Sequence, residues 1–418
     1  MRKHIGVLTS DYTPRRSASS KALQNLCREL AKTNNVTVFH TQSDTLSSPG
    51  TLDGYELRRI SDVGVDLRAR YEGAARQGNR FASNLLLMAS RVWTHVNKRL
   101  SGTNVNKPLA RSFFRAIRTE QLDAIIAICY PFEGLMAAAR YARSHPETKF
   151  IAWMGDMFAN REFDLASGAT SARRNERMVK LEAGVLRQAS HVFYTNEMAP
   201  YIASRYPDVL ERAEPLPFFP VMEELKSDLP PIMEPGSLAY FGSLGGDKDP
   251  RYALELIGAC VDSGTLTGVA SQFRVDIFTQ VNATSRSLVG SCSSGAHVHL
   301  HDFEPVERVK RLMLDASWLL VIGSLQRQIP SIKVDEYIAT GKPILYVAQI
   351  EEDPNLYKLD NYPLALVVRR GDGFSSNVEQ VSAFLVESMD KRVPFADIAE
   401  RYPLGLPDAA SKLFESQM

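Results

Sequence analysis

Between two short apolar runs the chain reads PSIKVDEYIATGKPI, residues 330–344. The apolar run before this segment, at 318–322, and the run that begins at Ile344 are typical of buried parallel strands. The segment itself predicts a helix at 335–340, followed by a Gly-Lys-Pro turn into the next strand. A helix that starts just after a parallel strand offers backbone N–H groups and a positive dipole end, which together suit a phosphate.

Two charged side chains lie near the start of this predicted helix. Lys333 adds a full positive charge beside the expected phosphate position, and Glu336 lies one turn further along. The Glu336 carboxylate can accept hydrogen bonds from two ribose hydroxyls. With Ser331 at the helix start, these residues predict a binding site for a nucleotide. A capped surface helix with ordinary charges would give the same pattern.

The alternation of strands and helices continues on both sides of this segment. In the second half of the chain, the pattern predicts further strands at 238–241, 274–279 and 297–301, with helices at 252–262 and 306–315. The first half shows the same alternation. Its predicted strands are 5–9, 36–39, 124–129, 150–153 and 191–194, and its clearest helices are 20–32 and 174–188.

Four prolines with charged residues between them mark residues 218–236 as a linker. The expected organisation is therefore α/β, with one Rossmann-like domain at 1–217 and a second at 237–395. Residues 396–418 are expected to form a C-terminal helix. Paired domains of this kind hold ligands in a cleft between them, at the carboxyl ends of the strands.

Composition narrows the class of protein. The 418 residues are 44% hydrophobic and 23% charged with a net charge of +1, so no overall field would attract nucleic acid. The four cysteines lie far apart, which argues against a disulfide framework and favours a reducing compartment. The first residues do not read as a signal peptide, and no apolar run approaches the ~20 residues that span a bilayer. We expect a cytoplasmic protein.

The loop after the first strand of the second half holds another candidate site. It reads GSLGGDKDP, residues 242–250, and its glycines allow the backbone to approach a ligand closely. Gly242 and Ser243 begin this loop, and Lys248 follows as a candidate phosphate contact. A solvated loop lysine is the alternative.

Two patterns superficially resemble metal sites. Residues 247–249 form a DxD triplet, and His297, His299 and His301 alternate along one predicted strand face. Triplets of this kind are common by chance, and the histidines have no acidic or cysteine partner at a suitable spacing. We expect no metal.

Two candidates follow strands of the first half. Asp156 comes just after the predicted strand at 150–153, where catalytic groups gather, and a carboxylate there can take the proton of an acceptor hydroxyl. Capping of the following turn is the alternative role. Between the first strand and the first helix, Arg15 and Arg16 can bind a phosphate or an acidic sugar in bidentate fashion, or lie on the surface.

Residues 67–118 form a basic region. They contain eleven lysines and arginines against one acid, Glu72, with aromatic residues such as Phe81 and Trp93 between them. Basic faces with exposed aromatic residues can lie on an anionic membrane, so this region predicts peripheral membrane contact. A solvated helical insertion is the alternative.

In their order along the chain, these segments resemble the GT-B glycosyltransferases of the family 4 kind. Many bacterial members carry P-S-K-L-x-[DE]-Y-x-A-x-G-[KR]-P-I before a late strand, and residues 330–344 match it apart from an extra Ile332. The wider family often has two glutamates eight residues apart here. Glu336 matches the second, which holds the donor ribose in the family, whereas Gln328 stands in place of the first.

The resemblance implies roles for the other candidates. Lys248 matches the position of a basic residue that meets the pyrophosphate, and the backbone around Phe303 corresponds to the place where relatives hold the base. Asp156 stands near the position of a histidine in many retaining members. Some inverting members, including the xanthan glucuronosyltransferase type, have an aspartate base in this region and a TPRR comparable to residues 13–16.

The sequence therefore predicts a GT-B enzyme that transfers a sugar from a nucleotide diphosphate-sugar to a glycan or lipid-linked acceptor, as in cell-surface polysaccharide biosynthesis. No metal cofactor is expected, because Lys333, Lys248 and the helix dipole can offset the charge of the departing diphosphate. The resemblance also implies that the last helix crosses back to the first domain. Two alternatives remain: a non-catalytic protein that binds a sugar nucleotide, and a nucleotide-sugar 2-epimerase.

Overall fold

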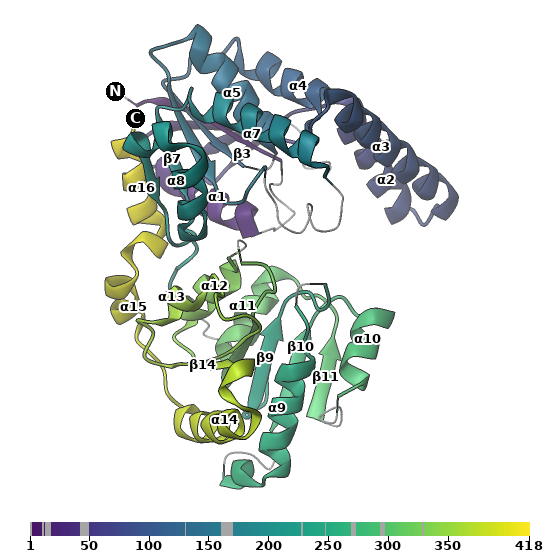
Figure 1. The fold of residues 1–418 in the computed structure, drawn as a ribbon, viewed down its shortest axis with the longest axis vertical. Coiled ribbons are helices and arrows are strands. Elements are labelled where there is room, and N and C mark those ends of the chain that lie inside the picture. The colour runs from purple at the N-terminus through teal and green to yellow at the C-terminus, as the bar shows by residue number, and fades with distance from the viewer. Residues whose placement is uncertain are drawn as a thin grey trace. The chain divides into compact units, whose positions relative to one another are not determined.

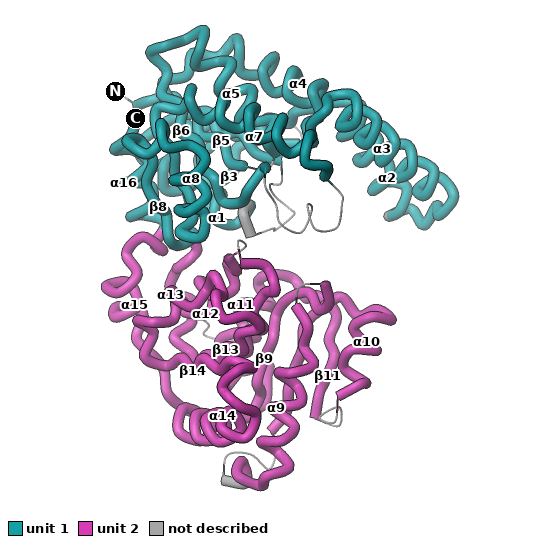
Figure 2. The backbone as a smooth tube through the Cα atoms, viewed as in Figure 1, with its two compact units in different colours: residues 1–220, 407–418 teal, residues 221–406 magenta. Residues whose placement is uncertain are grey.

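The computed structural model describes residues 2–10, 12, 18–41, 50–129, 131–159, 170–226, 229–246, 248–268, 273–292, 297–327 and 330–418. The chain forms two compact units, shown in Figure 2: unit 1 contains residues 1–220 and 407–418, and unit 2 contains residues 221–406. The division after residue 220 falls inside the segment 218–236 that the sequence analysis sets apart as a linker. The chain returns to unit 1 at Pro407, whereas the C-terminal helix was expected to begin at 396.

Unit 1 is built on an eight-stranded sheet with the order β3-β4-β2-β1-β5-β6-β7-β8 (Figure 1). All neighbouring strands are parallel except β3 and β4. Strand β5 reads AIIAI and is buried along its whole length, as expected for a parallel sheet that is covered on both faces. The strands are β1 (His4–Thr9), β2 (Asn35–His40), β3 (Gly50–Leu52), β4 (Tyr55–Arg59), β5 (Ala124–Ile128), β6 (Lys149–Met154), β7 (His191–Tyr194) and β8 (Ala213–Pro215).

The helices of unit 1 fall into two groups. Several cover the sheet, whereas α2 and α3 pack side by side as a hairpin that extends beyond it (Figure 1). No helix in the described part of the chain is both long and apolar enough to cross a membrane. The helices are α1 (Ala18–Leu30), α2 (Val63–Arg76), α3 (Arg80–Ser101), α4 (Lys107–Ile117), α5 (Phe132–Ser144), α7 (Ala172–Leu186), α8 (Ala199–Arg205) and α16 (Pro407–Ser416).

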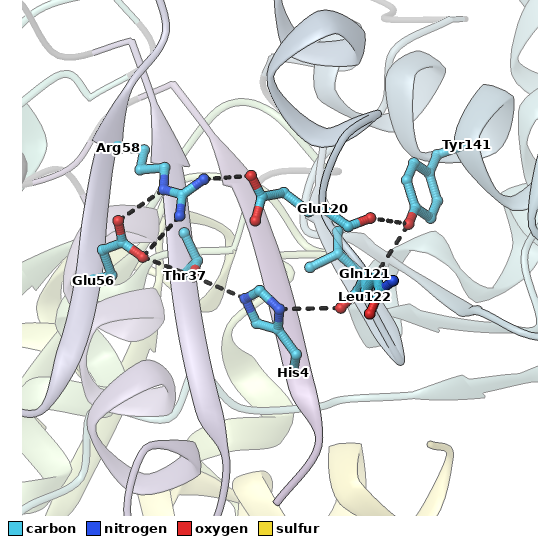
Figure 3. A network of polar contacts seen from close by, with 8 residues as sticks. All are labelled: His4, Thr37, Glu56, Arg58, Glu120, Gln121, Leu122 and Tyr141. Atoms are coloured by element: carbon cyan, nitrogen blue, oxygen red, sulfur yellow. Dashed lines mark hydrogen bonds and ion pairs between the residues drawn. The ribbon is translucent and has the colours of Figure 1, made fainter.

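A network of polar side chains joins the amino ends of the central strands of unit 1 (Figure 3). Arg58 bridges the carboxylates of Glu56 and Glu120, and the His4 ring lies between the Thr37 hydroxyl and a backbone carbonyl just before β5. Ligands of parallel sheets bind at the carboxyl ends of the strands. The network is at the opposite edge, so we assign it to fixing the strands of the sheet.

The last helix, α16, packs against unit 1. Its Phe414 ring contacts Trp153 and Phe193, with ring centroids 5.5 Å and 4.4 Å apart. The Glu415 carboxylate accepts hydrogen bonds from the side chains of Thr33 and Asn34, each at 2.6 Å. These contacts with β6, β7 and the turn after α1 explain why the final residues belong to unit 1 although unit 2 precedes them.

Unit 2 is built on a parallel six-stranded sheet with the order β11-β10-β9-β12-β13-β14. The chain winds outward from β9 in one direction and from β12 in the other, as in a Rossmann fold. The strands are β9 (Ser237–Phe241), β10 (Arg274–Phe278), β11 (Val298–His301), β12 (Trp318–Ile322), β13 (Ile344–Ala348) and β14 (Ala365–Arg369). The helices are α9 (Arg251–Asp262), α10 (Ala283–Gly290), α11 (Val306–Asp315), α12 (Ile332–Thr340), α13 (Leu356–Leu359), α14 (Phe374–Ser388) and α15 (Phe395–Arg401).

Every strand that the apolar runs predict has a counterpart in one of the two sheets. The α/β prediction of two Rossmann-like domains is therefore confirmed. Helix α12 is longer than expected, because it begins at Ile332 and not at residue 335. Its predicted end is confirmed: Gly341 has a φ of 75°, a left-handed conformation that glycine adopts without strain.

Candidate nucleotide site

The carboxyl ends of β9 and β12 lie side by side at the centre of the unit 2 sheet, where the direction of winding reverses. Parallel α/β sheets bind their ligands at this switch point, in the loops that follow the two strands. Gly242 follows β9 and Gly323 follows β12. The predicted donor residues on the loops after β9 and β12 therefore lie where the fold favours a ligand.

The β9 loop is a tight reversal that carries Lys248. The Gly242 N–H donates to the Phe278 carbonyl at 3.1 Å, and Gly245 exchanges backbone hydrogen bonds with Lys248. Gly245 has a φ of 95°, which a residue with a side chain rarely adopts. Ser243 is exposed, and its carbonyl accepts a hydrogen bond from a tyrosine hydroxyl at 2.8 Å. The glycines thus hold the half-buried Lys248 beside the end of β9.

The structure adds Asp353, a buried carboxylate on the β13 loop, to this edge of the sheet. Its Oδ1 accepts hydrogen bonds from the Tyr346 hydroxyl at 2.6 Å and the Asn355 backbone at 3.0 Å. Its Oδ2 has no hydrogen-bond partner among the described residues. Burial raises the pKa of Asp353, and the positive charge of Lys248 is among the effects that oppose this rise.

The space around Asp353 also fixes the residue after β12. A Cβ atom placed on Gly323 would lie 2.3 Å from the free Oδ2, closer than two such atoms can approach. Glycine is therefore required there, and this brings the β12 loop against the β13 loop. Neither Gly323 nor Asp353 was predicted from the sequence, although an aspartate followed by Pro-Asn after a buried strand is a recognisable loop signal.

The β13 loop also fixes the start of helix α12. The Ser331 N–H donates to the Asn355 side chain at 2.7 Å, so this amide is already occupied. The N–H groups of Ile332 and Lys333 have no acceptor inside the helix, whereas the Val334 N–H donates to the Ser331 carbonyl at 3.3 Å. Tyr337 accepts a hydrogen bond from the Phe241 N–H at 3.0 Å, which ties α12 to the end of β9.

The two predicted donor residues of α12 contact each other. Lys333 Nζ and Glu336 Oε2 are 2.6 Å apart, and the Glu336 side chain is only 8% exposed. The neighbouring residue on the same helix, Asp335, forms an ion pair with Lys358 of α13 at 3.0 Å, and neither side chain is exposed. Helix α12 therefore combines a buried pair that anchors it with a half-buried pair at its start.

Three aromatic rings lie at the ends of β9, β10 and β11, on the side of β9 away from β12. Phe241, Phe278 and His301 are the last residues of β9, β10 and β11, and their rings stack with centroids 4.7 Å and 4.5 Å apart. Phe303, the predicted base contact, lies just beyond this stack and is 58% exposed. A nucleobase could stack on an exposed ring in this position.

The histidine triad has a structural explanation in the described residues. His301 Nε2 lies 2.7 Å from a carboxylate oxygen of Asp276, and His299 is exposed. Burial alone would raise the pKa of Asp276, but hydrogen bonds from His301 and Ser237 outweigh it and lower that pKa. The described residues contain no group of three or more His, Cys, Asp or Glu placed to hold a metal ion. Of the DxD triplet, Asp247 lies outside the described residues.

Asp156 lies at the carboxyl edge of the unit 1 sheet, two residues after β6, as predicted. Its Oδ1 accepts a hydrogen bond from the Met157 N–H at 2.7 Å, so the carboxylate also orders its own turn. Phe158 stacks on Phe132 with centroids 3.8 Å apart, which ties this residue to the start of α5. The predicted phosphate contacts Arg15 and Arg16 lie outside the described residues.

Comparison with solved structures identifies the architecture. The chain aligns over 99% of its length with 98% of a sucrose-phosphate synthase from Thermosynechococcus elongatus, at a TM-score of 0.63 and 13% identity. It aligns with Anabaena Alr3699/HepE in complex with UDP-glucose over both full chains, at 0.59 and 10%. For WaaG, a glycosyltransferase involved in lipopolysaccharide biosynthesis, the values are 0.57 and 13%, covering 98% of this chain and 99% of that one. The chain matches no protein-family profile and no curated protein sequence. It has the two-domain GT-B fold.

Proposed function

We propose that this GT-B chain is a glycosyltransferase that takes a sugar from a nucleotide diphosphate-sugar. The observation that carries the proposal is the arrangement at the switch point of unit 2. There the Lys333–Glu336 ion pair lies at the start of α12, and Lys248 lies on the neighbouring β9 loop. Two cations and a helix start suit a diphosphate, and a carboxylate beside them suits the ribose hydroxyls.

In the proposed donor site, Lys333, Lys248 and the amides of the first turn of α12 stabilise negative charge on the departing diphosphate. Glu336 accepts hydrogen bonds from the ribose, and Phe303 stacks on the base. Gly242 and Ser243 allow the phosphates to approach the β9 loop. Because the protein itself supplies this positive charge, the proposed reaction uses no metal ion.

The proposed base is Asp156. As the acceptor oxygen bonds to the anomeric carbon of the sugar, its proton passes to the Asp156 carboxylate, and the bond to the diphosphate breaks with its electron pair on the leaving oxygen. Arg15 and Arg16 are proposed to contact phosphate or an acidic sugar.

The acceptor is proposed to be a glycan or a lipid-linked sugar in cell-surface polysaccharide synthesis, at the cytoplasmic side of a membrane. The involvement of WaaG in lipopolysaccharide biosynthesis supports an acceptor of this kind. The basic region at 67–118 would bring the enzyme to such an acceptor. UDP-glucose is the first donor to test, because the HepE structure contains it.

Nucleotide binding is measured first, as the change in melting temperature with UDP, ADP, GDP and dTDP. A ligand at 100 times its dissociation constant adds ~2.7 kcal/mol of stability. One diphosphate should stabilise the wild type, and Lys333→Ala should weaken its binding by ~10–100-fold. Lys391→Ala, at an exposed lysine of unit 2, is the matched control and should bind like the wild type. If no nucleotide stabilises the wild type, the proposed donor site is wrong.

Transfer is measured next, with the sugar nucleotide whose base binds. Asp156→Asn should lower the transfer rate by ~10²–10⁴-fold and leave nucleotide binding unchanged. Binding without transfer or hydrolysis would instead favour the non-catalytic alternative. Interconversion of the donor in the absence of any acceptor would favour the epimerase.

A further inference from the structure

One helix of unit 1 exposes a continuous apolar stripe. Along the 22-residue α3, six apolar side chains recur at steps of three and four residues, which places them on one face of the helix. Between 45% and 83% of the surface of each residue is exposed. The stripe consists of Phe81, Leu85, Met88, Val92, Val96 and Leu100.

The opposite face of α3 is the one that packs. The Ser90 hydroxyl donates to the Gly64 carbonyl of α2 at 3.2 Å, and a Cβ atom on Gly64 would lie 3.0 Å from the Trp93 ring. Ser83, one of the two buried residues of α3, lies two turns before Ser90 on this same face. The stripe therefore has no part in holding the hairpin together, and packing among the described residues of unit 1 does not explain why it is apolar.

Exposed cations flank the stripe. Arg80, Arg91 and Lys98 are exposed and follow one another at steps of eleven and seven residues, close to whole turns, so they lie along one side of α3. Arg68 and Arg70 are exposed on α2. The single acid of the region, Glu72, already contacts Arg68 at 3.7 Å.

We infer that this face of α3 binds an anionic lipid surface, with the apolar stripe at the level of the acyl chains and the flanking cations against the headgroups. An amphipathic helix of this kind lies in the plane of the interface. A second copy of the chain fits this face less well, because an antiparallel contact between two α3 helices would place the two rows of cations on the same side, where they repel each other. An anionic membrane satisfies the charge and the apolar stripe at once.

The inference does not rest on the proposed enzymatic activity, because lipid binding needs neither a donor nor an acceptor. It narrows the basic region of 67–118 to one helix face. If glycosyl transfer is also correct, the face would hold unit 1 against the membrane that contains a lipid-linked acceptor.

The test is co-sedimentation of the full chain with vesicles of phosphatidylglycerol and phosphatidylcholine, compared with phosphatidylcholine alone, at low and high salt. The wild type should bind the anionic vesicles, and high salt should weaken the binding. The triple variant Arg80→Gln/Arg91→Gln/Lys98→Gln should lose on the order of a hundredfold in partition coefficient.

A matched control removes the same net charge elsewhere. The triple variant Lys180→Gln/Lys226→Gln/Lys412→Gln neutralises three exposed lysines outside the hairpin and should bind like the wild type. Equal losses in the two triple variants would show that only net charge matters and would overturn the inference.

The stripe is tested with Leu85→Gln/Met88→Gln, which should weaken binding by on the order of tenfold or more. Both side chains are more than half exposed, so the melting temperature should stay at the wild-type value. Absence of wild-type binding to anionic vesicles would refute the inference. A wild-type dimer in light scattering that Leu85→Gln/Met88→Gln converts to a monomer would also refute it, in favour of a second copy.

Discussion

Glu182→Gln tests a buried carboxylate that accepts hydrogen bonds from the backbone at 158–159, just after Asp156. Glu182 lies on α7 with no exposed surface, and its Oε2 accepts hydrogen bonds from the hydroxyls of Tyr201 at 2.5 Å and Tyr206 at 2.8 Å. Burial raises the pKa of Glu182 to about 7, although the tyrosine hydroxyls and the backbone at 158–159 act in the opposite direction. The group therefore ionises in the folded protein only near neutral pH.

The sign of the effect follows from proton binding. The folded pKa of Glu182 is raised from 4.5 to about 7, so between these values the folded state holds a proton that the unfolded chain has lost. The stability that this group contributes is complete below the unfolded pKa and is lost as the pH rises through 7. The difference amounts to ~3 kcal/mol. Glutamine keeps the shape and an oxygen acceptor but cannot ionise, so the variant avoids this loss.

The assay is urea unfolding at steps from pH 4.5 to 8. In a Trp318→Phe background the two remaining tryptophans, Trp93 and Trp153, both lie in unit 1 and report its unfolding. Relative to Glu182→Gln, the parent should lose ~3 kcal/mol across this range. Glu176→Gln changes an exposed carboxylate of the same helix and should follow the parent. A constant difference between the parent and Glu182→Gln across the range would refute the reasoning.

Three further substitutions test the packing inside each of the two units. Lys358→Ala leaves the buried carboxylate of Asp335 without its cation and should cost ~3–5 kcal/mol in thermal unfolding. Gly323→Ala should cost ~1–3 kcal/mol and weaken nucleotide binding, whereas Gly371→Ala, where a Cβ meets nothing within 4 Å, should change stability by less than ~0.5 kcal/mol. Phe414→Ala should cost unit 1 ~3–5 kcal/mol, and limited proteolysis should then remove the C-terminal helix faster than in the wild type.

The sequence predicted most clearly the strands that are buried on both faces, because burial leaves an uninterrupted apolar run. Strand β12 reads WLLVI and every residue is buried. Strand β4 reads YELRR and is only partly buried, so it leaves no such run. Strand β14 at the sheet edge was missed although it reads ALVVR and carries an apolar run. Strands β3 and β8 have three residues each, too few for any periodicity to be read.

The candidate site could be predicted from the sequence only where its residues are close together in the chain. Lys333 and Glu336 belong to one local segment, and the structure places them at the start of α12. Asp353 and Asn355 went unnoticed because their contacts, with the Lys248 charge and the Ser331 amide, join distant segments. A loop aspartate and a loop asparagine look like ordinary turn residues until packing shows what they hold.

The Lys333–Glu336 ion pair affects how any substitution in the proposed donor site is interpreted. The sequence analysis assigned Lys333 to phosphate and Glu336 to ribose as separate contacts, yet their charged atoms are 2.6 Å apart. Lys333→Ala leaves a largely buried carboxylate without its cation, so unit 2 should lose stability before any nucleotide is added. Only the nucleotide-induced shift, taken against the same variant without nucleotide, therefore measures the phosphate contact. Hydrogen bonds from the ribose hydroxyls to the Glu336 carboxylate weaken its ion pair with Lys333. The Lys333 ammonium group can then bind the phosphates more strongly. Ribose and diphosphate should consequently bind cooperatively in the wild type, and this gain should disappear in Lys333→Ala.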